Sequence, residues 1–285
     1  MLELNIAAYH QLLLEGRLTS ETLVAFYLDR IQRFDGILAS IICVNPVAME
    51  LARECDRSLR GAGRLSGSLH GVPVLLKDNI ETKDMPTTAG SLSLEGFSTG
   101  KDADLVKRLK AAGAIILAKT NLHEFAIWGE SISSIKGQTL NPYDLTRTPG
   151  GSSGGTGAAL AANFGLVGIG TDTINSIRSP SSANNLVGIR PTVGLVSDEG
   201  IVPYSLTQDT AGPLARTVAD AAAVLKVIAI RDLPKADISR KPKIGILKSF
   251  FGTEPVNDEV NQMIAEVIKE MCSSGIEFIE IDENI

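Results

Sequence analysis

Cysteine and histidine are scarce in this chain of 285 residues, and their scattered positions exclude several kinds of site. The sequence contains three cysteines and three histidines: Cys43, Cys55, Cys272, His10, His70 and His123. The cysteines are odd in number and widely spaced, which matches neither a disulfide framework nor a metal-ligand motif. We therefore predict that the protein uses no metal and no other cofactor.

Long apolar runs and an excess of positive charge are also missing. No apolar run approaches the length of a membrane-spanning helix, and the first residues lack the basic start and apolar core of a secretion signal. The formal net charge is -6 and the isoelectric point lies near 5.2, without a cluster of Lys and Arg. This charge argues against a nucleic-acid surface. We expect a cytoplasmic protein whose partners include neither a membrane nor a nucleic acid.

The amino-acid composition is typical of a globular protein with a sizeable core, since 44% of the residues are hydrophobic and 21% are charged. Helical periodicity predicts helices near residues 3–15, 20–31, 46–61, 102–112, 218–228 and 257–271. Short apolar segments predict strands at 72–76, 114–118, 166–171, 187–189, 193–196, 243–247 and 276–281. Strands that are apolar throughout are typical of parallel sheets buried on both faces. We predict an α/β fold with a mixed, largely parallel central sheet covered by helices on both faces.

The stretch from residue 149 to residue 178 concentrates the polar and flexible residues. A loop rich in Gly, Ser and Thr leads into an Ala-rich helical segment, an apolar strand and a second polar turn. Glycine in such numbers indicates backbone that turns tightly or approaches another group closely. A surface linker would also be rich in Gly and Ser, although this run is short and flanked by apolar segments. We interpret it as a functional loop.

Known catalytic motifs fit this loop poorly. Gly150-x-Ser152-x-Gly154 matches the nucleophile elbow of serine hydrolases, but that motif requires a histidine after the serine, and all three histidines come before it. Gly155-Thr156-Gly157 lacks the lysine of a phosphate-binding loop. No cysteine lies in a polar Gly-rich turn. A serine nucleophile with a lysine as base is the remaining choice.

One lysine stands where such a base could lie. Lys77 directly follows the predicted strand 72–76 and begins a polar string with Asp78 and Asn79. A lysine at the end of an apolar strand is more often a surface residue than a catalytic base: its aliphatic chain packs on the protein and its amine lies in solvent. Local sequence leaves both interpretations open.

Several motifs together resemble the amidase signature family. The matching segments are Gly71-Val-Pro-Val-Leu-Leu-Lys-Asp78, Gly150-Gly-Ser-Ser-Gly-Gly155, Gly170-Thr-Asp-Thr173, Ser176-Ile-Arg178, Val187-Gly-Ile-Arg-Pro-Thr192 and the segment 209–220. The resemblance extends from about residue 3 to the end of the chain. Residues 191–213 are most similar to bacterial amidases of the peptide-amidase type. The resemblance implies one amidase-type domain over residues 1–285, with N-terminal helices in 1–65, a signature core in 66–230 and a C-terminal α/β portion in 240–285 that is truncated.

The resemblance also implies a Ser-cisSer-Lys triad. Ser176 would be the nucleophile, Ser152 the bridging serine in a cis peptide bond, and Lys77 the base. Ser153 would support this network, while Asp172 and Arg178 would hold the loop. The implied reaction is hydrolysis of a small-molecule or peptide amide to an acid plus ammonia or an amine, through an acyl-enzyme on the serine.

A lysine base must be neutral, which requires a pKa about 3 units below the ordinary value of about 10.4. The end of a buried strand would supply the desolvation for this change. A negative charge from Asp78 or Asp172 would oppose it, so we expect both to point away from Lys77 or to pair with Arg178.

The chain departs from the family pattern at the turn before the proposed nucleophile. The backbone of Thr173, Ile174 and Asn175 would form the oxyanion hole, but family members usually carry glycine directly before the nucleophile. Family domains also extend beyond the point where this sequence stops. We therefore keep two alternatives: an inactive amidase-like pseudoenzyme or interaction module, and the amidase subunit of an aminoacyl-tRNA amidotransferase. An oligomer is compatible with all three hypotheses.

Overall fold

The structure is a computed structural model that describes residues 3–234 and 242–281. Contacts divide the chain into two units, Met1–Leu233 and Pro234–Ile285. The division lies between the predicted core at 66–230 and the predicted C-terminal portion at 240–285. The grouping of both units into a single amidase domain stays a prediction. No helix among the described residues is long and apolar enough to cross a membrane.

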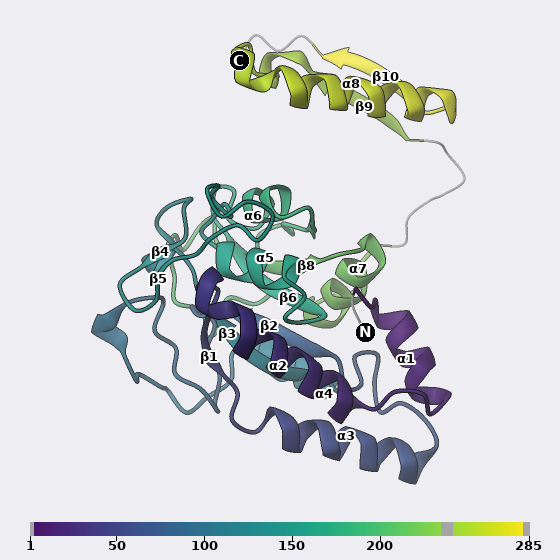
Figure 1. Cartoon of the computed structure of the whole chain (residues 1–285). Helices are drawn as coiled ribbons and strands as arrows, with labels where there is room; N and C mark the ends of the chain where they lie inside the picture. Colours follow the sequence, from purple (N-terminus) through teal and green to yellow (C-terminus); the bar gives the residue numbers. More distant parts are fainter. Residues whose placement is uncertain (1–2, 235–241, 282–285) are drawn as a thin grey trace. The chain divides into compact units, whose positions relative to one another are not determined.

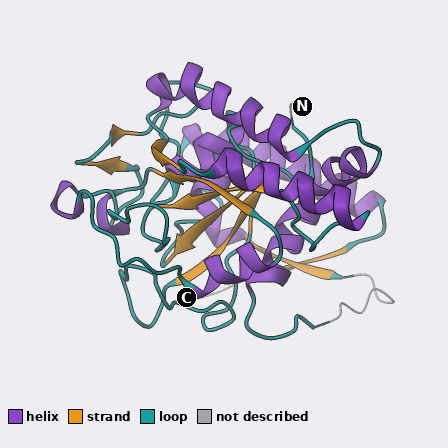
Figure 2. Ribbon diagram, turned by 90° about the horizontal axis from the view of Figure 1, so that it is seen from below, coloured by secondary structure: helices purple, strands orange, loops and turns teal. Residues whose placement is uncertain are grey.

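A six-stranded sheet forms the centre of the first unit (Figures 1 and 2). Its strands lie in the order β1 (Ile41–Val44), β3 (Ile115–Thr120), β2 (Pro73–Lys77), β6 (Val167–Asp172), β8 (Thr210–Ala215) and β7 (Val187–Gly188). Strand β2 pairs in parallel with both β3 and β6, whereas β1 and β8 run in the opposite direction. Strand β7 is antiparallel to β8 and so shares the direction of β6. The predicted mixed, largely parallel sheet is confirmed.

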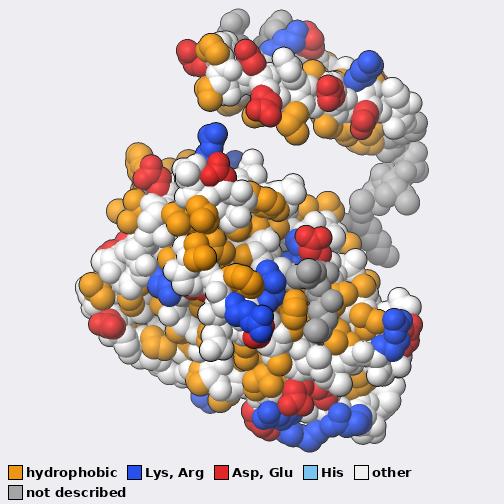
Figure 3. All heavy atoms as spheres, in the orientation of Figure 1, with side chains coloured by type: hydrophobic (Ala, Val, Ile, Leu, Met, Phe, Trp, Pro, Cys, Tyr) orange, Lys and Arg blue, Asp and Glu red, His pale blue; other side chains and the backbone are white. Residues whose placement is uncertain are grey.

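Helices cover the two faces of this sheet. They are α1 (Ile6–Leu14), α2 (Ser20–Leu38), α3 (Ala48–Ala62), α4 (Asp104–Ala111), α5 (Gly154–Ala161), α6 (Arg178–Ala183) and α7 (Val218–Ile228). The Thr19 hydroxyl accepts a hydrogen bond from the Thr22 amide and caps α2 as a serine or threonine at this position usually does. Charged side chains of both signs cover the outer face of α3 (Figure 3), where Arg53 and Arg57 pair with Glu50.

Glycines bring α5 directly onto the sheet. A Cβ atom on Gly155 would lie 2.2 Å from the carbonyl oxygen of Asn121, and one on Gly168 would lie 2.5 Å from the Thr156 side chain. These distances leave no room for larger residues, so the glycines of the 149–178 stretch serve close approach as well as turning. The loop before α5 is thereby fixed beside the ends of β2 and β6.

The second unit is a parallel β-α-β arrangement. Strands β9 (Lys243–Leu247) and β10 (Glu277–Ile281) pair in parallel, and α8 (Asp258–Ser273) connects them. All three elements match the predicted segments 243–247, 257–271 and 276–281. The sequence therefore predicts the local structure of this unit well.

Three parts of the first unit differ from the sequence-based prediction. The predicted strand 193–196 is wrong, because Gly194 has a φ of +78° and only Val196 makes an isolated bridge, to Ala229. Strands β1 and β8 and helix α6 are present but were not predicted. The segment 119–149, in which we predicted no helix or strand, contains the end of β3, a short hairpin of β4 (Ile132–Ser133) and β5 (Gly137–Gln138), and a 3-10 turn, Glu124–Ala126.

Candidate active site

Two neighbouring parallel strands end at the same edge of the sheet and carry the main polar groups of the site. Strand β2 ends at Lys77, and strand β6 ends at Asp172. Their register pairs Leu76 with Ile169, so the residues that follow lie side by side. The carboxyl ends of strands in such sheets are the usual location of binding sites.

Lys77 lies against hydroxyl groups rather than against a carboxylate. Its Nζ atom is 2.7 Å from Ser152 Oγ and 2.8 Å from Thr171 Oγ1. Lys77 and Ser152 are completely buried, and the peptide bond between Gly151 and Ser152 is cis. Burial lowers the pKa of Lys77 from 10.5 to about 7, against the opposing attraction of Asp172 and Asp209.

Ser153 joins the glycine-rich loop to strand β6. Its hydroxyl donates to the carbonyl oxygen of Thr171 at 3.1 Å and accepts from the Thr171 amide at 3.3 Å. The Ser153 amide in turn donates to the carbonyl oxygen of Ser176 at 3.3 Å. Ser153 therefore holds the loop of Ser152 and the turn of Ser176 next to each other.

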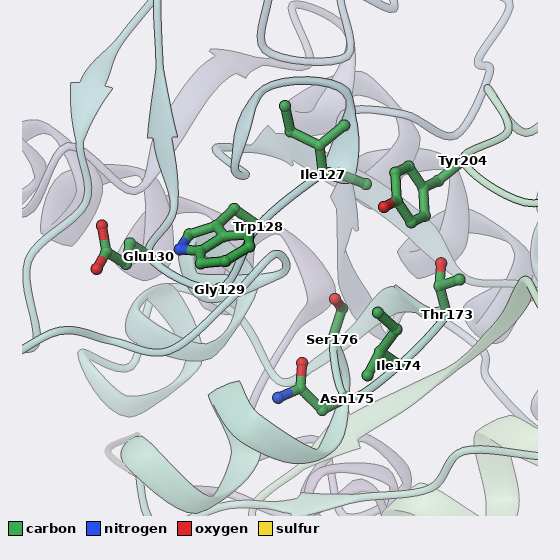
Figure 4. A pocket seen from close by; sticks show the side chains of 10 residues that line it. Ile127, Trp128, Gly129, Glu130, Thr173, Ile174, Asn175, Ser176 and Tyr204 are labelled. Atoms are coloured by element: carbon green, nitrogen blue, oxygen red, sulfur yellow. The ribbon is translucent and has the colours of Figure 1, made fainter.

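Ser176 lies at the edge of a pocket of about 350 Å³. Within the described part of the chain no hydrogen bond joins its hydroxyl to Ser152 or to another side chain. Figure 4 shows this hydroxyl directed into the space between Trp128 and Tyr204. Ser176 is thus the one serine of the three that faces the pocket, while Ser152 and Ser153 are covered.

Asp172 holds the turn that carries Ser176. Its buried carboxylate accepts a hydrogen bond from the Ile177 amide at 2.9 Å and pairs with Arg178 at 3.3 Å and with Arg190 at 3.2 Å. Burial alone would raise the pKa of Asp172, but the hydrogen bonds from Arg178 and Ile177 outweigh it and lower the pKa. Asp172 therefore pairs with Arg178, as the sequence led us to expect, and Arg190 adds a second cation.

The turn of Thr173, Ile174 and Asn175 forms one wall of the pocket. Neither Ile174 nor Asn175 belongs to the described residues with a left-handed φ, so the backbone here does not require glycine. Ile174 is 69% exposed, and its carbonyl oxygen accepts a hydrogen bond from Arg178. Among the described residues, none accepts a hydrogen bond from the amides of Ile174, Asn175 or Ser176. These three backbone donors are free to bind a ligand.

Other groups of the site were not singled out from the sequence. Thr171 accepts hydrogen bonds from Lys77 and, at 3.1 Å, from Asn79. The Asp209 carboxylate accepts from the Thr173 hydroxyl at 2.5 Å and from the Tyr204 amide at 2.7 Å. Asp209 thereby ties two walls of the pocket together. It opens one of the motifs quoted above, but its partners lie 36 and 5 positions away in the chain, which no local pattern reveals.

The pocket is mainly apolar and aromatic on the side opposite Ser176. Ile127, Trp128 and Tyr204 lie there together with the carboxylate-bearing Glu130 (Figure 4). The described residues include no group of three or more His, Cys, Asp or Glu side chains that could hold a metal ion. The pocket and its supporting contacts bring together serine hydroxyls, a buried amine and backbone amides.

Comparison with known proteins identifies relatives with the same architecture. A family model described as Amidase matches residues 22–284. The A subunit of the glutamyl-tRNA(Gln) amidotransferase of Corynebacterium jeikeium (strain K411) is 38% identical over 93% of this chain and 57% of the relative. The native peptide amidase of Stenotrophomonas maltophilia is 41% identical with a TM-score of 0.88, covering 99% of this chain and 62% of that structure.

An amidase family protein from Bacillus anthracis str. Ames is 33% identical with a TM-score of 0.89, covering 99% of this chain and 61% of that structure. This chain therefore spans about three fifths of the length of the relatives that it matches.

Proposed function

Because this chain belongs to the amidase family, we propose that it is an amidohydrolase that cleaves carboxylic amides with Ser176 as nucleophile, Ser152 as bridging serine and Lys77 as base. The proposal concerns the activity of a chain that spans about three fifths of its relatives. The observation that carries it is the contact of 2.7 Å between the buried Lys77 amine and the Ser152 hydroxyl. An amine held this way, without a carboxylate in contact, is suited to accept a proton.

The proposed reaction begins with two proton transfers. Neutral Lys77 accepts the proton of Ser152, while Ser152 accepts the proton of Ser176, which requires the Ser176 hydroxyl to turn from the pocket towards Ser152. The Ser176 oxygen forms a bond to the amide carbonyl carbon, and the tetrahedral intermediate carries a negative oxygen. The proton then returns from Lys77 through Ser152 to the nitrogen, the C–N bond breaks, and ammonia or an amine leaves. Water attacks the resulting ester on Ser176 by the same route and releases the acid.

The sequence pointed to the backbone of Thr173, Ile174 and Asn175 for stabilising that negative oxygen, whereas the candidates we propose are the amides of Ile174, Asn175 and Ser176. They are free of partners among the described residues and lie in the wall of the pocket that Ser176 faces. Donors fixed in this way stabilise an oxyanion much more strongly than a neutral carbonyl. Loss of one donor typically lowers the rate by about 100- to 1,000-fold. This arrangement supports activity in spite of the side chains of Ile174 and Asn175.

The pocket favours small-molecule or peptide amides with an apolar or aromatic group. A volume of about 350 Å³ lies within the range of small-ligand pockets. Trp128, Ile127 and Tyr204 supply apolar surface, and Trp128 is 67% exposed. Contact with an apolar group of the substrate would cover this surface.

An amide panel tests the proposal on the intact chain. We expect release of ammonia or amine from peptide amides and aromatic carboxamides by the wild type. Lys77→Met and Ser176→Ala should each lower kcat/KM by at least about 1,000-fold while circular dichroism stays unchanged. Equal rates for the wild type and Ser176→Ala would overturn the assignment of the nucleophile.

The names of the sequence relatives favour a second function. Several of them are A subunits of glutamyl-tRNA(Gln) amidotransferases at 37–39% identity. In this alternative the chain would act as one component of an assembly and release ammonia for it. Affinity purification of the tagged chain at its natural level distinguishes the two functions. A stoichiometric partner and glutaminase activity in the complex would favour the amidotransferase, and an active chain without a partner would favour the amidase.

The third alternative, a pseudoenzyme or interaction module, rests on Ile174 and Asn175. It predicts that changing both to glycine leaves the chain without amidase activity. A large gain of activity in that variant would refute a purely non-catalytic role.

A further inference from the structure

One wall of the pocket also packs on the loop that carries Ser152. Residues 126–130 line the pocket, and most of them are seen in Figure 4. A Cβ atom on Gly151 would lie 2.7 Å from the carbonyl carbon of Gly129 and 2.9 Å from the amide nitrogen of Glu130. The pocket wall is therefore in direct contact with the residue that precedes Ser152.

Ser131 directly follows this wall, and its side chain is completely buried. The Ser131 hydroxyl donates to the carbonyl oxygen of Gly150 at 2.9 Å and accepts from the amide of Gly154 at 2.9 Å. The carbonyl oxygen of Ser152 lies 3.4 Å from the same hydroxyl. A hydroxyl has one hydrogen to donate, and the shorter contact with Gly150 uses it. Ser131 therefore contacts the loop both before and after Ser152.

The backbone of Ser131 is fixed in a conformation that serine seldom adopts. Its φ is +58°, in the left-handed region, where residues other than Gly, Asn and Asp are uncommon. Its carbonyl oxygen accepts a hydrogen bond from the Thr139 amide at 3.0 Å, across the base of the hairpin β4–β5. Residues held in such conformations by surrounding contacts are frequent at functional sites. This observation directs attention to what the Ser131 side chain does.

The contacts of Ser131 bear on the position of the Ser152 hydroxyl. In a serine a single torsion separates the backbone from Oγ, so the backbone largely decides where the hydroxyl lies. The loop backbone is held by Ser131 on either side of Ser152, and the Ser152 carbonyl oxygen also accepts from the His123 amide at 3.0 Å. In this arrangement Ser152 Oγ lies 2.7 Å from the Lys77 amine.

We propose that Ser131 is a positioning residue, whose hydroxyl holds residues 150–154 in the place where Ser152 Oγ contacts the Lys77 amine. The proposal rests on the amidase function proposed above, in which Ser152 passes a proton to Lys77. Among the described residues, the pocket lining ends at Glu130 in this segment, and the buried Ser131 lies just beyond it. Ser131 therefore acts on the proton transfer and not on substrate binding.

The experiment removes the hydroxyl and keeps the backbone conformation. Ser131→Gly does this, because glycine adopts a left-handed φ without steric cost. Steady-state assays of the intact chain give kcat and KM, thermal melts give the stability, and crystal structures give the distance from Lys77 Nζ to Ser152 Oγ. Ser131→Ala is the second variant, since Ala39 and Ala89 also have a positive φ in this chain. It carries the test if Ser131→Gly does not fold.

Ser133→Ala is the matched control. Ser133 is a buried serine of the same hairpin, but its hydroxyl donates to the Asn121 side chain at 2.7 Å. This variant should lower the melting temperature and leave kcat and KM close to the values of the wild type. It therefore reports what the loss of a buried hydroxyl in this hairpin does by itself.

Ser131→Gly should lower kcat by about 100-fold, because displacement of a reacting group by about 1 Å has an effect of this size. KM should stay within about 3-fold of the wild type, since the pocket lining is unchanged. The Ser152 hydroxyl should lie beyond hydrogen-bond distance of Lys77 in the crystal structure. The melting temperature should fall no further than in Ser133→Ala.

A merely structural Ser131 would give a different result. An unchanged kcat with the contact between Lys77 and Ser152 intact would overturn the proposal, and so would a lower kcat with this contact intact. An equal fall of kcat in Ser133→Ala would also overturn it, since any weakening of the hairpin would then suffice.

Failure of the proposed function can be told apart from failure of this inference. If the wild type hydrolyses no amide, the proposed function is wrong, and the crystallographic distance alone decides the role of Ser131. A displaced Ser152 in Ser131→Gly would then support that role, and an undisplaced one would overturn it. A displaced Ser152 with unchanged kcat would support the positioning by Ser131 and contradict the proposed proton transfer through Ser152.

Discussion

Replacing Lys77 by methionine should make the protein more stable and inactive at the same time. Burial lowers the pKa of Lys77 from 10.5 to about 7, so the unfolded chain binds the lysine proton more tightly than the folded protein does. The burial of Lys77 therefore does not reduce the unfolding free energy above pH 10.5, where the amine is neutral in both states. As the pH falls from 10.5 towards 7, protonation of the unfolded chain lowers the unfolding free energy progressively. Below pH 7 the full loss is about 5 kcal/mol, and at pH 8 it is about 3 kcal/mol.

Methionine has a similar length and no charge, so Lys77→Met removes this loss. The variant also loses the contacts of the Lys77 amine with Ser152 and Thr171, which changes the unfolding free energy by an amount that does not depend on pH. The difference in unfolding free energy between variant and wild type should therefore grow by about 1.4 kcal/mol for each pH unit from pH 10 down to 7.

Urea denaturation followed by circular dichroism at pH 6, 7, 8 and 9.5 measures this slope. Lys83→Met is the matched control, because Lys83 is exposed and its variant should show no such dependence. A difference for Lys77→Met that is the same at every pH would refute the reasoning, since it would mean that Lys77 keeps an ordinary pKa in the folded protein.

Three further predictions concern the pocket and its support. Changing Ile174 and Asn175 to glycine should alter kcat for a small amide by less than about 10-fold, because the backbone donors are already present; a gain of 100-fold or more in steady-state assays would contradict this. Asp209→Ala should raise KM by about 10-fold with a smaller effect on kcat, since its carboxylate holds two pocket walls; an unchanged KM would count against that role. Gly155→Ala should destabilise the protein by more than about 2 kcal/mol, because its Cβ would lie 2.2 Å from a carbonyl oxygen, whereas Gly61→Ala has open space and should be neutral or stabilising in thermal melts.

The central strands of the sheet could be predicted from the sequence because they are buried on both faces. The predicted segments 72–76, 114–118 and 166–171 each lie within a few residues of β2, β3 and β6. A continuous apolar run of this length is typical of a strand that is buried on both faces of a parallel sheet. Boundaries shifted by one or two residues because the strand ends carry the polar site residues.

Strand β8 could not be predicted because its sequence contains Gly212 and Pro213, which are typical of turns. The structure gives the glycine a reason: a Cβ there would lie 2.2 Å from the Ile189 carbonyl oxygen. The segment 193–196 shows the opposite error, since its valines and leucine suggested a strand while Gly194 turns the chain. Tertiary packing decides both cases, and local composition does not contain that information.

The sequence motifs name the main residues of the candidate site, Lys77, Ser152 and Ser176, but not its supporting contacts. The structure brings the Lys77 amine to 2.7 Å from the Ser152 hydroxyl, and the catalytic roles of the three residues stay a proposal. The pairing of Asp78 with Lys119 depends on the alignment of β2 with β3. The link from Asp209 to Thr173 depends on the path of the loop before β8. Such contacts across the sheet have no signature in a single sequence.

The identity of the nucleophile is the central claim, and mapping of a covalent adduct tests it most directly. The intact chain is treated with a fluorophosphonate, digested, and the modified peptide is sequenced by mass spectrometry. We predict a single adduct on Ser176, absent from Ser176→Ala and formed much more slowly in Lys77→Met. Failure of the folded wild type to react, or an adduct on Ser152 or another serine that persists in Ser176→Ala, would contradict the account.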